Sequence, residues 1–238
     1  MTNVDTLKDA GRPPAGESAD PHDPVPTAID WLLGVLTGLL GLILTAVGVG
    51  MYTRVDQALI ADVLAQESVQ VNGLTQPEFI TAAGPFVDWL AIGTVVTGAT
   101  AVVGAAVFVV GRRRTRRRVA REGGTTATFW GCTVYGAVVT ALVSFIPGSA
   151  IGGGAAAAYL HDGNSSVRIG TAAGLIGTAL TIPLVAFLAV GIVAGSGAIG
   201  ELAGGTLLAV IIIGGELVAL AINAGLGALG GFAAAKFV

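Results

Sequence analysis

The chain has 238 residues, of which 53% are hydrophobic and only 11% charged, with a formal net charge of −3. Soluble domains usually carry about a quarter charged residues, so this composition argues against water-soluble enzymes and nucleic-acid-binding proteins. The mean hydropathy is +0.81, and the apolar residues lie in runs of roughly 20 or more, long enough to cross about 30 Å of hydrocarbon as helices. The sequence therefore predicts an all-α, polytopic integral membrane protein.

The first segment, residues 1–26, is acidic and rich in proline. It holds five acidic residues and five of the nine prolines, with few large apolar side chains. Such a segment buries too little apolar surface to offset the entropy of ordering it. We therefore expect a disordered cytoplasmic tail, and its lack of a basic n-region argues against a cleaved signal peptide.

Residues 27–122 are predicted to form a two-helix membrane module. Its apolar runs cover about 28–52 and 85–111, and the polar stretch 54–82 lies between them. Seven of the ten arginines follow the second run, at 112–121. The module therefore consists of two spans, one connecting loop and one basic cluster.

The arginine cluster orients the chain. Short basic loops stay on the cytoplasmic side of a membrane, which places 54–82 outside and predicts a multi-pass protein of the cell membrane with both termini in the cytoplasm. Arginines next to a bilayer also attract anionic lipid head groups, by about 1 kcal/mol each. No aromatic residue interrupts the cluster, so no nucleic-acid partner is expected. The residues concerned are Arg112, Arg113, Arg114, Arg116, Arg117, Arg118 and Arg121.

The loop 54–82 carries helical signals of its own. Val55, Leu59 and Val63 share one face of a helix, and the segment from Thr75 to Glu78 has the form of a helix capping box. We therefore expect a partly helical extracellular cap.

Residues 123–238 are predicted to form a four-helix, glycine-rich membrane domain. Apolar runs cover about 126–145, 146–160, 169–196 and 203–238. With the two spans of the first module, this predicts six transmembrane helices in all.

The fourth of these six runs is short. Ile146 to Leu160 is 15 residues, or about 22 Å of helix, and Pro147-Gly148 breaks the chain at its start. The alternative is five spans, with 148–160 as a re-entrant segment whose ends are covered by protein or water. A repeat favours six spans, because GGAAAAYL at 153–160 matches GGFAAAKF at 230–237.

Glycines at four-residue spacing predict close helix packing. Small residues let transmembrane helices approach so that backbones touch, in the manner of a glycine zipper. This packing can occur within one chain or in a homo-oligomer, and the sequence does not choose between them. The motifs pair Gly34 with Gly38, Gly148 with Gly152, Gly170 with Gly174, and Gly227 with Gly231.

The pattern of SFIPGSAIGGGAAAAYLHDG, VRIGTAAGLIGTALTIPL and a closing ALGGFAAAKFV resembles an uncharacterised family of small four-helix, glycine-rich membrane proteins of haloarchaea. The likeness covers roughly residues 123–238. It implies a four-helix topology and an archaeal source. It implies no activity, because none is assigned to that family.

Glu216 is the candidate functional residue, because it lies deep inside the last apolar run. An ionised carboxylate there costs about 2.5 kcal/mol or more, so the group is expected to be protonated, hydrogen-bonded or facing water. Asn223 lies two turns further along the same helix face, and Pro183 is expected to bend a neighbouring helix. These residues are interpreted either as a polar path for a solute or proton, or as a structural bond to a hydroxyl of Tyr135, Thr140, Ser144, Thr178 or Thr181.

Other polar residues carry weaker signals. Asp30 and Asp88 each begin a span beside a tryptophan, which is ordinary chemistry for a helix end. Cys132 is the only cysteine, and His22 and His161 lie far apart, so neither a disulfide nor a metal or other cofactor is expected.

The first hypothesis for function is a non-enzymatic structural or assembly protein that packs through glycine-rich helix faces. The alternative is a small channel or transporter with a polar site at Glu216 and Asn223, which would take a small solute or ion. No catalytic arrangement of side chains is expected, and the lipid bilayer is the expected surrounding.

Overall fold

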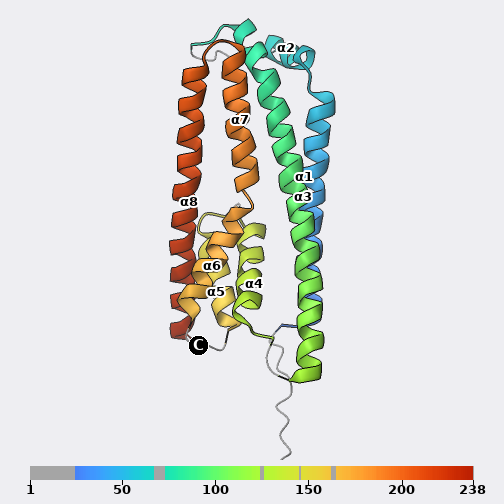
Figure 1. Ribbon diagram of the computed structural model, residues 1–238, viewed down its shortest axis with the longest axis vertical. Helices are drawn as coiled ribbons and strands as arrows, with labels where there is room; N and C mark the ends of the chain where they lie inside the picture. Colours follow the sequence, from blue (N-terminus) through green and yellow to red (C-terminus); the bar gives the residue numbers. More distant parts are fainter. Residues whose placement is uncertain (1–24, 67–72, 124–125, 145, 162–164, 238) are drawn as a thin grey trace, which may run out of the picture.

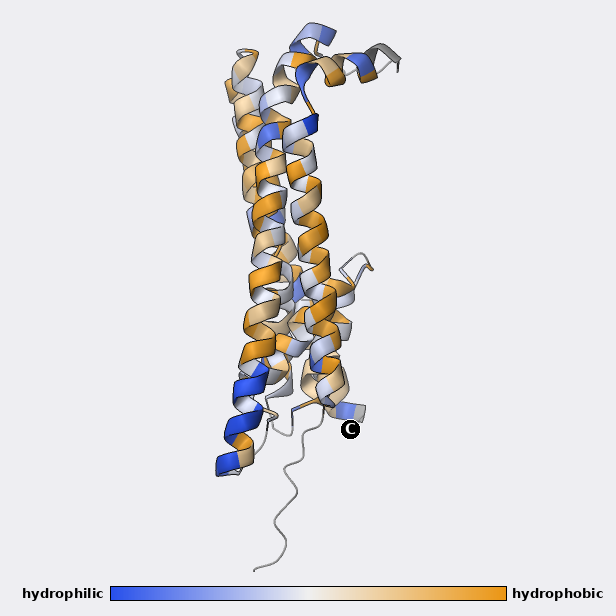
Figure 2. Ribbon diagram, turned by 90° about the vertical axis from the view of Figure 1, so that its right-hand side faces the viewer, coloured by the Kyte–Doolittle hydropathy of each residue, from blue (hydrophilic) through white to orange (hydrophobic). Residues whose placement is uncertain are grey.

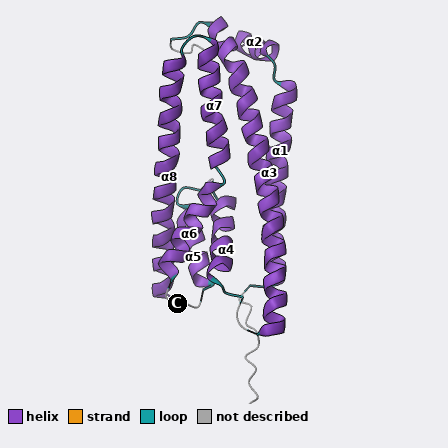
Figure 3. Cartoon of the chain, in the orientation of Figure 1, coloured by secondary structure: helices purple, strands orange, loops and turns teal. Residues whose placement is uncertain are grey.

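Four long apolar helices determine the architecture of the computed structural model. The structure describes residues 25–66, 73–123, 126–144, 146–161 and 165–237, and within these ranges all regular secondary structure is helical (Figure 3). The predicted disordered tail falls almost entirely on residues 1–24, which lie outside the described ranges.

The helices follow in order along the chain. They are α1 (Thr27–Arg54), α2 (Gln57–Gln66), α3 (Gln76–Glu122), α4 (Phe129–Leu142), α5 (Ser149–Tyr159), α6 (Ser166–Ala179), α7 (Ile182–Ala198) and α8 (Leu202–Phe237).

Four stretches among the described residues are long and apolar enough to cross a membrane: α1, α3, α6 together with α7, and α8. They lie side by side in an elongated bundle (Figure 1). Hydrophobic residues cover the middle of the bundle, and hydrophilic residues gather toward its ends (Figure 2). The prediction of an all-α protein with several helices long and apolar enough to span a membrane is therefore confirmed.

The two ends of the bundle differ. One end holds the arginine cluster 112–121, the start of α1 and the end of α8, and is called the basic end below. The other end holds α2 and is called the α2 end (Figure 1).

The predicted third and fourth spans form a half-length hairpin instead. α4 has 14 residues and α5 has 11, about 21 Å and 16 Å of helix, and neither reaches across about 30 Å of hydrocarbon. Both occupy only the half of the bundle near the basic end, and the turn between them lies midway along it (Figures 1 and 3). Neither the count of six spans nor the alternative of five is supported, since four stretches of the described residues are long enough to span. The short part includes α4 as well as α5.

Capping and continuity explain why α3 is longer than its apolar run. The backbone N–H of Thr75 donates to Oε2 of Glu78 at 2.8 Å, and the capping box predicted there begins the helix. The helix then continues through the basic cluster to Glu122. The arginines therefore extend a helix, whereas the sequence predicted that they lie in a loop. The helix α2 confirms that the cap is partly helical.

Glycines bring α1 and α3 into backbone contact. A Cβ at Gly41 would lie 2.6 Å from the carbonyl oxygen of Gly98, and one at Gly48 would lie 2.8 Å from that of Ala91. A Cβ at Gly34 would overlap the side chain of Val109. These three glycines of α1 recur every seven residues, a spacing that was not recognised in the sequence. Gly38, which was predicted to pack closely, makes only ordinary contact with the Ala105 side chain.

The second set of glycines joins α6 and α8. Gly170 and Gly227 each lack room for a Cβ because the carbonyl of the other lies there. In the same way Gly174 lies against the backbone of Asn223, and Gly231 lies against that of Ser166. These two predicted motifs therefore form one interface within the chain.

The motif formed by Gly148 and Gly152 does not pack two helices. Gly148 has φ +83° and forms the N-cap of α5, a backbone conformation that side chains rarely adopt. A Cβ at Gly152 would meet nothing within 4 Å. The neighbouring Gly153 makes the tight contact instead, against Gly136 and Thr140 of α4.

The two predicted parts of the chain meet mainly through α3 and α7, while α4, α5 and α6 pack against each other and against α8. The module of α1 and α3 therefore makes few contacts with α4 and α5, the two helices of the hairpin. This arrangement leaves space between them.

Candidate functional site

Two interruptions in the helices meet near the middle of the bundle. The first is the hairpin turn between α4 and α5, and the second is the break between α6 and α7. Pro147 and Thr181, one from each interruption, line the same cavity as Glu216 of α8. Glu216 is the fifteenth of the 36 residues of α8, so this cavity lies close to half of the helix length.

The cavity has a volume of about 450 Å³. Its walls come from every helix except α2, and α8 presents Glu216, Ala219 and Asn223 on one face. The sequence placed Glu216 and Asn223 on one stripe, and the structure places both in the same wall. The polar residues of the lining are Thr97, Thr140, Ser144, Ser149, Thr178, Thr181, Glu216 and Asn223.

Local sequence explains both interruptions. Pro147 lies between α4 and α5, and proline does not fit the interior of a helix because it lacks the backbone N–H. Gly148 supplies the positive φ from which α5 begins. Pro183 lies in the first turn of α7, where its missing N–H is tolerated. That missing N–H also removes the regular partner of the carbonyl of Ala179, the last residue of α6. The sequence predicted a bend at Pro183, and α6 and α7 are separated there by Leu180 and Thr181.

Four helix ends therefore lie beside the cavity. α5 and α7 begin there, and α4 and α6 end there. The first N–H groups and the last carbonyls of a helix lack regular helical partners and carry partial positive and negative charge. Such ends are tolerated at membrane depth only where protein or water covers them.

The carboxyl group of Glu216 is hydrogen-bonded to Thr181, which lies in the break between α6 and α7. Its Oε1 lies 2.6 Å from Oγ1 of Thr181, and this Oγ1 lies 2.6 Å from the carbonyl oxygen of Thr178. Thr181 is one of the five hydroxyl residues expected as partners from the sequence. Glu216 is half-buried and Thr181 is exposed, so the cavity opens to the surroundings of the bundle at this point.

Two buried hydroxyls face the space beside the hairpin without a partner among the described residues. They are Thr97 of α3, which lines the cavity of Glu216, and Thr37 of α1, which lines the cavity next to it. Each residue is only 8% exposed. A buried hydroxyl without a hydrogen bond costs free energy, and a water or polar ligand in these cavities would satisfy both.

A crevice leads from this cavity to the basic end. A cavity of about 330 Å³ between α1, α3, α4 and α6 shares Ala101, Ala141 and Leu180 with it. A third cavity, of about 310 Å³, continues past Phe108 and Val134 to Arg112. The three adjoin along the loose contact between the two parts of the chain.

Toward the α2 end, α3 and α7 pack tightly. A Cβ at Gly93 would lie 2.6 Å from Cβ of Phe187, and one at Gly195 would lie 2.5 Å from the carbonyl oxygen of Ala82. The rings of Trp89 and Phe187 stack with centroids 5.9 Å apart. The α3–α7 contact therefore bounds the cavity on this side, and the two adjoining cavities lie on the other.

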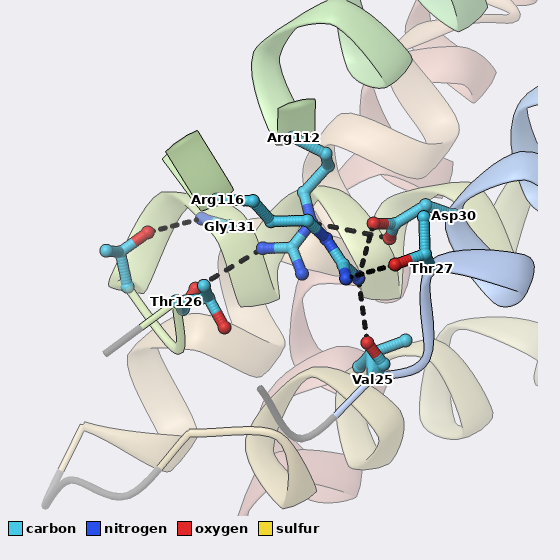
Figure 4. A network of polar contacts seen from close by, with 8 residues as sticks. Val25, Thr27, Asp30, Arg112, Arg116, Thr126 and Gly131 are labelled. Atoms are coloured by element: carbon cyan, nitrogen blue, oxygen red, sulfur yellow. Dashed lines mark hydrogen bonds and ion pairs between the residues drawn. The ribbon is translucent and has the colours of Figure 1, made fainter. Parts of the chain in front are cut away.

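Two arginines of the cluster form an ion-pair network with Asp30, and of these Arg112 is buried and Arg116 is partly buried (Figure 4). Nη2 of Arg116 lies 2.7 Å from Oδ2 of Asp30, and Nε of Arg112 lies 3.4 Å from Oδ1. Arg116 also donates to the Val25 carbonyl and the Thr27 hydroxyl. Asp30 lies in the first turn of α1, as predicted. Its carboxylate has a further role that the sequence did not show, because it joins the start of α1 to α3.

This network also changes the role predicted for the arginine cluster, which was contact of all seven arginines with the membrane surface. Arg112 is 7% exposed and lies over the Tyr135 ring, with 4.9 Å from Cζ to the centroid, so it is not a lipid-facing residue. Five arginines are exposed, and these fit the predicted membrane surface: Arg113, Arg114, Arg117, Arg118 and Arg121.

The remaining candidates take structural positions. Sγ of Cys132 donates to the Leu160 carbonyl at 3.3 Å, and the His161 ring contacts the Ala127 carbonyl at 3.1 Å and Oγ of Ser165 at 3.0 Å. Within the part of the chain that the structure describes, no three His, Cys, Asp or Glu side chains are grouped to hold a metal ion. Asp88 is exposed.

The sequence named four of the hydroxyl residues in the polar wall that faces Glu216, but not Thr97. The four are Thr140, Ser144, Thr178 and Thr181. Thr97 gave no signal, because a threonine in an apolar helix usually bonds its own backbone, as Thr94 does to Leu90. The hairpin tip was noticed only as a break, and its depth in the bundle was not foreseen.

Comparison with known proteins adds no identification. No family model matches the chain, and no curated protein and no solved structure matches it. The resemblance to the haloarchaeal four-helix family therefore stays a prediction.

Proposed function

We propose that this chain is a small membrane transporter or channel whose solute or ion occupies the cavity at Glu216. One observation carries the proposal: a carboxyl group lies where a half-length hairpin and a broken helix both end near the middle of the bundle. Ionisable residues inside a membrane commonly mark ion or substrate paths. Discontinuous helices near the midplane are how many transporters form binding sites.

The unpartnered hydroxyls support this proposal. Thr37 and Thr97 are buried polar groups beside the cavities, without protein partners in the described ranges. Water or a polar solute in these cavities would satisfy both hydroxyls. The crevice toward Arg112 supplies access from one side.

The glycine contacts lend less support to the assembly hypothesis. Gly170, Gly174, Gly227 and Gly231, which were expected to drive packing, lie against one another or against nearby backbone inside the chain. They are not available for a second copy. A homo-oligomer would need another surface.

The basic end is proposed to face the cytoplasm, because short arginine-rich segments are retained there. Both termini of the protein then lie inside the cell, and the five exposed arginines contact anionic lipid. In this orientation the crevice opens toward the cytoplasm.

Flux through reconstituted protein tests the proposal. Purified protein in liposomes is screened against monovalent cations, anions and small neutral solutes, with empty liposomes as the baseline. Glu216→Gln should reduce the flux of the transported species at least tenfold. Glu201→Gln is the matched control, because Glu201 lies exposed just before α8 and should leave that flux unchanged.

Two results would overturn the proposal. One is flux no greater than that of empty liposomes for every species. The other is flux that Glu216→Gln and Glu201→Gln reduce equally, since the path would then not pass Glu216.

A further inference from the structure

The hydroxyl of Thr181 contacts two oxygens with only one proton of its own. Its Oγ1 lies 2.6 Å from the Thr178 carbonyl oxygen and 2.6 Å from Oε1 of Glu216. Both distances are those of true O–H···O hydrogen bonds. A carbonyl has no proton to give, and one O–H cannot point straight at both oxygens. Two near-linear bonds therefore require the second proton to come from the carboxyl group of Glu216.

The hydrogen-bond chain then has one direction. A protonated Glu216 donates to Oγ1 of Thr181, and Thr181 donates to the carbonyl of Thr178. This carbonyl is near the end of α6 and also accepts the backbone N–H of Thr181 at 3.0 Å, so both of its lone pairs are used.

Among the described residues that line the cavity, no cationic side chain faces Glu216 to hold it in its charged form. The cavity-lining residues from α1, α3, α4, α5, α6 and α7 include no other titratable side chain. In the proposed membrane position, the exposed Thr181 borders hydrocarbon on the outer side of the bundle, and this side disfavours a carboxylate. The geometry and the environment therefore agree on a neutral acid.

We propose that Glu216 is the binding site for a coupling proton, and that its protonation is linked to the break between α6 and α7. This inference rests on the proposed transport function and names the ion to which transport is coupled. When Glu216 releases its proton to water in the crevice, its carboxylate can only accept. It then competes with the Thr178 carbonyl for the single Thr181 proton, and one bond across the break is lost.

Carbodiimide labelling tests the proton site without knowledge of the solute. Dicyclohexylcarbodiimide modifies protonated carboxyl groups in apolar surroundings, and mass spectrometry of the full-length protein in proteoliposomes locates the product. Glu216 should be labelled near neutral pH, and labelling should fall as pH rises. Glu201 and Glu122, which are exposed, should remain unlabelled, and Glu216→Gln should remove the product.

Thr181 is a positioning residue in this chain, and its variants give a second readout. Thr181→Val removes the hydroxyl that bonds Glu216, so the dependence of labelling on pH should change. Thr181→Ser keeps the hydroxyl and should restore the profile of the natural protein. A profile that is the same in all three would contradict the hydrogen-bond chain.

Infrared difference spectra cover the case in which the reagent fails to reach the site. The difference between natural protein and Glu216→Gln should contain the C=O stretch of a protonated carboxyl group near neutral pH. If that band is absent and a carboxylate band replaces it, Glu216 is ionised and the inference falls.

Flux separates this inference from the function on which it rests. An imposed pH gradient should drive solute flux, and Glu216→Gln should abolish this coupling. Glu216-dependent flux that ignores the gradient would overturn the coupling and leave the transport function intact. A protonated Glu216 without any flux would overturn the transport function itself.

Discussion

The backbones of Gly170 in α6 and Gly227 in α8 touch, so that neither position has room for a Cβ. Gly227 also leaves no room for a Cβ at Gly154 of α5. One glycine thus holds the re-entrant hairpin and the broken helix against the same continuous helix.

Replacement of Gly227 by alanine should therefore destabilise the protein. The added methyl group meets backbone that cannot turn away, and overpacking of this kind costs about 1–3 kcal/mol. Thermal unfolding in mild detergent should show a lower Tm. Gly225→Ala is the matched control, because a Cβ there meets nothing within 4 Å, and a comparable loss in both variants would refute the assigned contact.

The buried network at Asp30 makes a second prediction. Asp30→Asn leaves the guanidinium of Arg112 buried with less compensating charge, and breaking a buried ion pair costs about 3–5 kcal/mol. Arg112→Gln should be comparably harmful, and the double variant should lose less than the sum of the two. Unfolding midpoints measure all three.

The control for this network is Arg114→Gln, which removes the same charge from an exposed position. Its unfolding midpoint should stay close to that of the natural protein. If Arg112→Gln and Arg114→Gln behave alike, the cluster acts only as a membrane-surface charge, and the network contributes nothing to stability.

The sequence predicted the long helices well, because hydropathy and capping are local properties. The apolar run at 28–52 became α1, and Thr75 and Glu78 cap α3 as expected. The prolines at 147 and 183 both lie at helix interruptions. Local chemistry therefore determined where helices begin and end.

Depth and pairing could not be predicted in this way. The run at 126–145 is apolar enough to span, yet α4 has only 14 residues, and its position depends on glycine contacts with α5 and α6. Asp30 and Arg112 are separated by 82 positions, and no local pattern joins them. The candidate site was half predicted: Glu216, Asn223 and Thr181 were named, whereas Thr97 and the crevice depend on packing.

The re-entrant hairpin makes a third prediction, in a Cys132→Ala background. A membrane-impermeant maleimide added from the outside should label Gln76→Cys at the start of α3, and should not label Ser144→Cys at the hairpin tip. Ser165→Cys should react only from the cytoplasmic side. Labelling of Ser144→Cys from outside as fast as Gln76→Cys would restore a six-span topology.

The proposed function requires that water reaches the cavity at Glu216. A pair of single-cysteine variants on α3 tests this most directly. Thr97 and Thr94 lie one turn apart and are each 8% exposed, but only Thr97 lines the cavity. In the Cys132→Ala background, a charged methanethiosulfonate reagent should modify Thr97→Cys much faster than Thr94→Cys. Equal rates, or no reaction at either cysteine, would contradict a polar path through this cavity.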